Sequence, residues 1–450
     1  MKQNFKIKIK LVIIIFLFLS SINIYSQCWN KVDGGHWNSF GIKNDGTLWG
    51  WGQNDGRLQT TSSVPIQIGS NTNWSNISSS YWYTLLQKSD GSLWGWGDDP
   101  FSSDGPNYGS TPIQIGTSID WVNFIAAQYH FLAIKSNGTL WTWGVNQYGQ
   151  LGDGTNVNKN SPIQIGTSTN WTQISGGDRH SLAIKSDGTL WAWGANDFAQ
   201  LGDGTTTAKN FPIQIGTANN WAKVEAGELC SFAIKTDGTL WAWGYNYFSQ
   251  LGNGNSQTLV VPTQIGTSTN WVKVISGHSH TLAINNNGKL YSWGSNNWGQ
   301  LGGGGNTINA VNNETDWNKI SVGYTHSLVL KSDNSLWVFG ENYYGQLGNG
   351  ITIDLWNPTA ISCPTSLSVE DLYNSQLKIY PNPTNNIINI ENNKYQIDRI
   401  ELYDVTGRLI ITEIVNKNNF ILNISDLQKA TFILKIHTDK KTQIVKIIKN

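Results

Sequence analysis

Four histidines recur along the chain, at His130, His180, His280 and His326. Repeated histidines could hold a metal ion, but zinc needs a small set of ligands that converge at about 2 Å. The matching positions of the other copies hold residues of different kinds, namely Asn38, Tyr83 and Cys230. We therefore expect the residues at this position to be structural polar groups that satisfy a loop, and we expect no metal.

A second possible chemistry is glycoside hydrolysis, which uses paired carboxylates. Asp98, Asp99 and Asp104 lie in one irregular segment, and Glu225 and Glu228 lie close together further along. Their spacing does not favour catalysis over solvated loop charge. No G-x-S-x-G, H-E-x-x-H or Cys/His signature is present. We expect no enzymatic activity and no cofactor, and we keep a glycan-binding or glycan-hydrolysing protein as the alternative.

The elements that carry these residues repeat. Lys185–Gly204 reads KSDGTLWAWGANDFAQLGDG, and its Asp187-Gly188 pair between two apolar runs is a strong hairpin signal. Copies of this hairpin stand at Asp45, Asp90, Asn137, Asp237, Asn287 and Asp333. The chain therefore contains seven related hairpins.

The spacing of the copies predicts the architecture. The leading tryptophans are Trp29, Trp74, Trp121, Trp171, Trp221, Trp271 and Trp317, which are 45, 47, 50, 50, 50 and 46 residues apart. A complete copy holds four strand-sized pieces, at Trp171–Ile174, His180–Lys185, Thr189–Gly194 and Pro212–Gly216. Four short strands per copy make one propeller blade. We predict an all-β, seven-bladed β-propeller in which tryptophan pairs such as Trp191 and Trp193 form the core.

The two ends of the chain differ from this repeated part. Residues 1–26 carry early lysines, a short apolar run and a polar exit, which indicate a secretory signal peptide. All 23 tryptophans lie between Trp29 and Trp356. Residues 28–362 hold 15 Lys+Arg against 21 Asp+Glu, whereas residues 370–450 hold 11 against 9. We predict a propeller at 27–363, a linker at 364–375 and a small β-sandwich at 376–450.

The three cysteines suggest how the ring is held. Cys28 precedes the first copy and Cys363 follows the last, while Cys230 lies inside the fifth. A closed ring brings its ends together, and an exported protein meets an oxidising compartment. We predict a Cys28–Cys363 disulfide and a buried, inert Cys230 thiol; the alternative is that the two outer cysteines lie on flexible ends and never meet.

Residues that change from copy to copy indicate where function lies. Two positions just before the histidine position form a loop on one rim of the ring, and they are rich in aromatic residues and arginine, as protein-binding surfaces are. The predicted partner-binding residues are His36, Trp37, Tyr81, Trp82, Tyr129, Arg179, Glu228, His278 and Tyr324. We expect them to be exposed, so that truncation of Trp37, Trp82 and Tyr129 costs binding but little stability. Neutral drift in exposed loops is the alternative reading.

The units G-x-x-H-S-L-A, L-W-x-W-G-x-N and Q-L-G-D-G-T resemble those of the RCC1-type propeller family, from Trp29 to about Ile361. In that family blades are commonly offset from the repeats, which implies that the first and last strands could share a blade. The family's best-known members act on a small GTPase and bind chromatin. We carry over neither activity, because this propeller is net acidic and exported. We expect no nucleic-acid partner.

The C-terminal segment reads LKIYPNPTNN from Leu377, then YDVTGR from Tyr403 and KIIK from Lys446. This order resembles the type A sorting domain of the type IX secretion system of Bacteroidetes-type bacteria. The resemblance implies contact with the secretion machinery through residues 376–450, export, removal of residues after about 365, and delivery to the medium or the outer surface. We expect a monomeric binding or adhesion module without a stable membrane span, which meets an extracellular protein or glycan.

Overall fold

The computed structural model describes residues 28–58, 60–97, 106–305, 307–364, 377–392, 396–404, 408–438 and 442–450. The signal-peptide prediction, and the predicted linker apart from Pro364, lie outside these residues. The chain divides into two compact units, Met1–Pro364 and Thr365–Asn450.

The Asp-Gly hairpin shows why each repeat folds locally. Gly188 has a φ of +77°, which suits glycine, and Asp187 Oδ1 accepts hydrogen bonds from the Thr189 backbone N–H at 3.0 Å and the Thr189 hydroxyl at 2.6 Å. The Thr189 hydroxyl in turn accepts a bond from Trp191 Nε1 at 2.9 Å. The turn, the strand start and the first tryptophan are therefore fixed by residues within one short segment.

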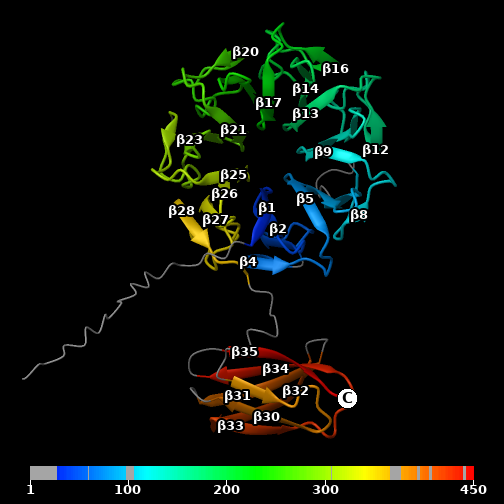
Figure 1. The fold of residues 1–450 in the computed structure, drawn as a ribbon, viewed down its shortest axis with the longest axis vertical. Coiled ribbons are helices and arrows are strands. Elements are labelled where there is room, and N and C mark those ends of the chain that lie inside the picture. Colours follow the sequence, from blue (N-terminus) through cyan, green and yellow to red (C-terminus); the bar gives the residue numbers. More distant parts are fainter. Residues whose placement is uncertain are drawn as a thin grey trace, which may run out of the picture. The chain divides into compact units, whose positions relative to one another are not determined.

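In the described part of the first unit, seven antiparallel four-stranded sheets stand around a central channel (Figure 1). The innermost strands are β1 (Trp29–Gly34), β5 (Trp74–Ser79), β9 (Trp121–Ala126), β13 (Trp171–Gly176), β17 (Trp221–Ala226), β21 (Trp271–Ser276) and β25 (Trp317–Val322). The second strands are β2 (Asn38–Lys43), β6 (Tyr83–Lys88), β10 (His130–Lys135), β14 (His180–Lys185), β18 (Cys230–Lys235), β22 (His280–Asn285) and β26 (His326–Lys331).

The third strands are β3 (Leu48–Gly52), β7 (Leu93–Gly97), β11 (Leu140–Gly144), β15 (Leu190–Gly194), β19 (Leu240–Gly244), β23 (Leu290–Gly294) and β27 (Leu336–Gly340). The outer strands are β4 (Ser62–Gln67), β8 (Ile113–Gln114), β12 (Lys159–Gln164), β16 (Lys209–Gln214), β20 (Leu259–Gln264), β24 (Asn309–Ala310) and β28 (Leu355–Ile361). The predicted seven-bladed propeller is confirmed.

The strand order shows how the blades are built. Each sheet is one contiguous segment, from β1–β4 through β25–β28, so the first and last strands do not share a blade, a point that the sequence left open. The outer strand predicted at Pro212–Gly216 runs instead from Lys209 to Gln214, because Gly194 pairs with Lys209 and Gly216 turns the chain with a φ of +62°.

The core lies between neighbouring blades. Trp193 is fully buried in a cluster with Trp171 and Ile174 of its own sheet and Leu132 of the sheet beside it. Trp191 packs against the same cluster but remains half-buried, and Lys185 Nζ lies 4.0 Å above its ring. Trp191 is therefore an edge residue and Trp193 a core residue, whereas both Trp49 and Trp51 of the first blade are buried.

The recurring histidines bond neighbouring blades to each other. Nε2 of His130 lies 2.7 Å from Ser181 Oγ on the next blade, and that hydroxyl donates its single proton to the Gln150 carbonyl at 2.8 Å. His130 Nε2 must therefore carry the donated proton. His180, His280 and His326 make the same contact with Ser231, Ser327 and Ser39. The polar role predicted for this position is thus realised across a blade interface and not only within a loop.

Sterics explain why the first residue of the G-x-x-H motif is glycine. A Cβ at Gly177 would lie 2.3 Å from Cε1 of His180 and 2.4 Å from the Gly227 carbonyl oxygen. The imidazole needs that space to reach the serine of the next blade.

These histidines should make the propeller unstable in acid. Burial lowers the pKa of each of the four imidazoles from 6.5 to about 3. Between these values the unfolded chain binds protons that the folded chain does not, so stability falls as pH falls from 6.5 towards 3. Burial raises the pKa of Asp33, Asp178 and Glu225 to about 6, 7 and 8. Between about pH 4 and 8 the folded chain binds protons at these carboxyls that the unfolded chain does not, so they make stability rise as pH falls.

We expect the free energy of unfolding to be nearly flat from about pH 7 to 5.5 and to fall steeply below about pH 4.5, where the carboxyls no longer compensate. Urea unfolding at a series of pH values measures this. A stability that rises below pH 4.5 would contradict the neutral, buried state of the four imidazoles.

The ring closes between the first and last blades. Cys28 and Cys363 form a disulfide with their Cα atoms 6.1 Å apart, as predicted. A hydrogen bond also joins the first and last blades, because Trp51 Nε1 donates to the Gln346 carbonyl at 2.9 Å. Cys230 is a free, buried thiol whose pKa burial raises to about 12.

The second unit is a small β-sandwich, as predicted. One sheet has the order β29 (Leu377–Tyr380), β30 (Ile387–Asn392) and β33 (Asn419–Asn423). The other has the order β32 (Leu409–Lys417), β31 (Ile397–Asp404), β34 (Thr431–Thr438) and β35 (Thr442–Ile448). A buried core that includes Ile390, Leu402 and Leu434 holds the sheets together.

Candidate functional site

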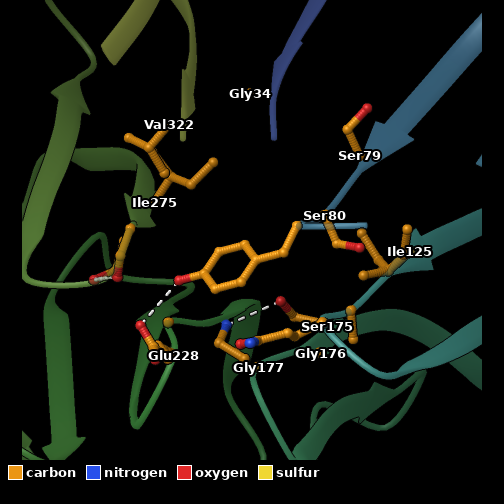
Figure 2. Close-up of a pocket in the computed structure, with 18 of the residues that line it drawn as sticks. Gly34, Ser79, Ser80, Ile125, Ser175, Gly176, Gly177, Glu228, Ile275 and Val322 are labelled. Carbon is orange, nitrogen blue, oxygen red and sulfur yellow. Dashed lines mark hydrogen bonds between the residues drawn. The ribbon is translucent and has the colours of Figure 1, made fainter. Parts of the chain in front are cut away.

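The central channel contains a cavity of about 240 Å³. Its wall is made by the ends of the inner strands and includes small residues such as Ser80, Ser175 and Gly176, with Ile125 and Ile275 on opposite sides (Figure 2). The sequence places these residues near the end of the inner strand in different blades, so the cavity exists only when the ring is closed.

One mouth of the channel is covered by side chains that follow the inner strands. His36 stacks on Tyr81 with ring centroids 4.5 Å apart, and Tyr324 contacts His36 and His278 at 4.5 and 4.3 Å. The Tyr81 hydroxyl donates to Glu228 Oε2 at 3.0 Å, a bond drawn to the labelled Glu228 in Figure 2. His278 Nδ1 meets the same carboxylate oxygen. Blades 1, 2, 5, 6 and 7 thus share one cluster on the channel axis.

The other predicted partner-binding residues surround this cluster. Trp37 stacks on His36 at 3.7 Å and contacts Tyr344 at 5.5 Å, while Trp82 meets the edge of His36 at 5.7 Å. Arg179 lies over the ring of Tyr129 at 5.7 Å.

The predicted residues all lie at this mouth, but they are not freely exposed. Each of the nine is half-buried. The expectation of full exposure is therefore wrong, because the closed ring turns the seven loops towards one another. Truncation of Trp37, Trp82 and Tyr129 would remove ring contacts within the protein as well as any contact with a partner.

A second set of aromatic residues lies on the same side, and the sequence reasoning missed it. Because His180 pairs with Gly194, the loop that follows β15 emerges beside the loop that precedes β14. In five blades this loop carries an aromatic residue two positions after an asparagine, namely Tyr148, Phe198, Phe248, Trp298 and Tyr344. The recurrence of an aromatic ring whose identity changes was the signal available in the sequence.

These outer aromatics join the axial cluster. Arg179 Nη1 donates to the Tyr148 hydroxyl at 2.9 Å, and Phe248 contacts His278 at 6.1 Å. Adjacent rings extend outwards, with Tyr247 69% exposed and Tyr343 71% exposed. We call the nine predicted residues, the five loop aromatics, Tyr247 and Tyr343 together the aromatic face.

The carboxylates considered for hydrolysis separate into two groups. Asp98, Asp99 and Asp104 lie outside the described residues. Glu225 and Glu228 line the channel rather than an irregular loop. Burial, together with the charge of Asp33, raises the pKa of Glu225 to about 8, so it is mostly protonated at neutral pH. The pairing of Glu225 and Glu228 with the loop aspartates remains a prediction.

No group of three or more His, Cys, Asp or Glu side chains within the described ranges is arranged to hold a metal ion. The Q-L-G-D-G loops show what their aspartates do instead. Asp153 accepts bonds from the Thr155 backbone N–H at 2.9 Å and from Asn146 Nδ2 at 3.0 Å, and it pairs with Lys159. Turn hydrogen bonds and one ion pair account for this carboxylate.

The blades, the G-x-x-H contacts and the loop motifs define an RCC1-type propeller. A family model described as the RCC1-like domain matches residues 20–270, more than half of the chain, and the chain therefore belongs to this family. Models of the RCC1 repeat match residues 271–300 and 317–346, and residues 287–330 and 333–371. A secretion system C-terminal sorting domain matches residues 378–450, which makes the protein an exported propeller.

Solved structures share the fold at low sequence identity. Human WBSCR16 is 20% identical with a TM-score of 0.61, over 71% of this chain and 94% of that chain. Yeast RCC1 (Prp20), solved bound to Kap60, is 19% identical with a TM-score of 0.63, over 74% and 85%. Prp20p from Saccharomyces cerevisiae is 19% identical with a TM-score of 0.63, over 79% and 91%.

A comparison with curated proteins gives no significant match. Among the described residues, no helix has the length and apolar character needed to cross a membrane.

Proposed function

We propose that this exported propeller binds an extracellular protein through its aromatic face and has no catalytic activity of its own. The observation that carries the proposal is the continuity of the axial cluster and the outer loop aromatics on one side of the ring. Aromatic residues and arginine dominate the binding energy of protein interfaces, because they bury large areas at low entropic cost. A propeller of the same fold, yeast RCC1, was solved with a protein bound, which supports this use of the architecture.

The sorting domain supports delivery of the propeller outside the cell. We propose that it directs export through the type IX machinery and is then removed, leaving the propeller in the medium or attached to the surface. The propeller part has a net charge of −6 over residues 28–362, which disfavours a nucleic acid as the partner.

The proposal predicts a loss of binding from outer aromatic truncations. Tyr247, Trp298 and Tyr343 are 69%, 46% and 71% exposed, so replacing all three with alanine should change the free energy of unfolding by only about 0.5 kcal/mol each. Each of these three side chains that is buried by the bound protein should contribute about 2 kcal/mol or more to binding. Its loss should therefore weaken the affinity about 30-fold. The measurement uses the immobilised chain to retain an extracellular protein, followed by titration of that protein against each variant.

The matched control is on the outer strands. Trp356 in β28 and Phe211 in β16 are each 54% exposed, and their replacement with alanine should leave the affinity unchanged. Equal losses in both variants would contradict a binding role of the aromatic face. Retention or hydrolysis of a soluble polysaccharide, with no protein retained, would favour the glycan alternative.

A further inference from the structure

The channel mouth opposite the aromatic face carries four lysines in adjacent blades. Lys223, Lys273, Lys319 and Lys31 occupy the third position of β17, β21, β25 and β1, near the start of each inner strand. The same position in the remaining three blades holds Asn76, Asn123 and Gln173. The ring of seven therefore contains four cationic and three neutral amide side chains and no acidic one. We call the four lysines the lysine arc.

The lysine side chains are held in one direction around the ring. Lys319 Nζ donates to the Asn30 carbonyl at 2.7 Å, and Lys31 Nζ donates to Asn76 Oδ1 at 2.6 Å. Lys223 and Lys273 reach the carbonyls of Val272 and Asn318 in the same way. Each ammonium therefore bonds to the next blade, where Lys273 Nζ also reaches Asn318 Oδ1 at 3.5 Å. An ammonium has three N–H donors, so each lysine keeps at least one for a further acceptor.

The close approach and partial burial of the four lysine charges are unfavourable. Burial lowers the pKa of Lys31, Lys273 and Lys319. Neighbouring lysines lower the pKa of Lys31 and Lys273 further, while the charge of Asp33 partly opposes this at Lys31. Within the described residues, none of the four makes an ion pair with a carboxylate, whereas Lys135, Lys159, Lys209 and Lys331 do. Glu225, the nearby acid of the channel wall, is mostly protonated at neutral pH because burial raises its pKa to about 8.

A cavity of about 250 Å³ opens beside two of these lysines, Lys223 and Lys273. Its lining also includes the carboxyl residue Glu225 and the uncharged Gln173, Val224, Val274, Ile275 and Ile320. This volume is smaller than the pockets that hold drug-sized ligands, so it suits a small group. Lysine acts as a point charge that binds phosphate-like groups, and several lysines together favour an anion that carries more than one negative charge.

We propose that the lysine arc is a binding site for a small, multiply charged tetrahedral oxyanion, a sulfate or phosphate group, at the channel mouth opposite the aromatic face. Such an anion would accept the free ammonium donors and replace the repulsion between the lysines with attraction. This site is independent of protein binding by the aromatic face, since the two lie at opposite ends of the inner strands.

The test is calorimetric titration of the purified chain with inorganic sulfate and phosphate, against sodium chloride of equal ionic strength. We expect saturable binding to the wild-type chain and at least a tenfold loss in the double variant Lys273→Gln, Lys319→Gln. The control Lys159→Gln, Lys209→Gln removes the same charge from the first residues of the outer strands β12 and β16 and should bind within twofold of wild type. Absence of binding to the wild-type chain, or equal losses in both double variants, would overturn the site.

Two further measurements separate binding from folding and identify the source of the anion. In chloride alone, Lys273→Gln, Lys319→Gln should melt no lower than wild type, because the repulsion is relieved. The single variant Lys223→Gln, at the most exposed of the four positions, should also weaken binding.

Acetate should bind more weakly than sulfate, and equal affinity would overturn the tetrahedral assignment. Glucose 6-sulfate compared with free sulfate distinguishes an esterified group from a free anion.

Discussion

Replacing Arg57 with methionine should destabilise the propeller by about 3–5 kcal/mol, the effect of leaving one member of a buried ion pair without its partner. The Arg57 side chain is fully buried and pairs with Asp55, whose side chain is 5% exposed. The guanidinium also donates to Thr84 Oγ1 at 2.9 Å and to the Tyr81 carbonyl at 2.7 Å. Removal of the guanidinium leaves both oxygens and the carboxylate buried without these donors.

The effect should be large because Arg57 makes a contact between blades that a histidine makes elsewhere in the ring. In blades with a histidine, the imidazole reaches a serine of the next blade, but the first blade has Asn38 at that position. Arg57 comes from the outer loop and bonds Thr84, the residue of the second blade that matches Ser181. The arginine therefore holds the first two blades together in place of the missing histidine.

Denaturant unfolding of Arg57→Met and of the double variant Asp55→Asn, Arg57→Met checks this explanation. The double variant should recover part of the loss, because the unpaired carboxylate is gone. Arg179→Met, at an arginine whose side chain is 40% exposed, is the control and should lose much less stability. A loss below about 1 kcal/mol for Arg57→Met would show that water reaches Asp55 after the substitution.

Opening the Cys28–Cys363 disulfide should have the second large effect, a loss of up to about 4–5 kcal/mol in the chain-entropy model. The bond closes a loop with a sequence separation of 335 residues, so it restricts most of the unfolded chain. No strand of the last blade pairs with the first blade, and the covalent bond therefore supplies a closure that backbone pairing does not.

The measurement compares unfolding of wild type with Cys28→Ser, Cys363→Ser, which leaves neither cysteine free at the closure. Cys230→Ser is the control for cysteine chemistry at a buried site, since its thiol lies 3.7 Å from Ser276 Oγ and forms no disulfide. Addition of a reductant should lower the stability of wild type and leave the double variant unchanged. Equal stability of the two oxidised proteins would mean that the noncovalent contacts between the first and last blades suffice.

The sequence by itself determined the repeated blade. The Asp187-Gly188 turn and the Thr189 contacts lie within a few residues, so local preferences report them without knowledge of the fold. Seven copies then require a closed ring, which made the Cys28–Cys363 neighbourhood predictable.

The tertiary structure decided how the copies meet. Arg57 substitutes for a histidine at an interface that no local pattern marks, and His36 reaches Tyr324 only because the last blade returns to the first. The exposure of the nine mouth residues was misjudged for the same reason. Each loop is exposed in one blade considered alone, but closure of the ring packs the seven loops against each other and leaves the outer aromatics as the accessible surface.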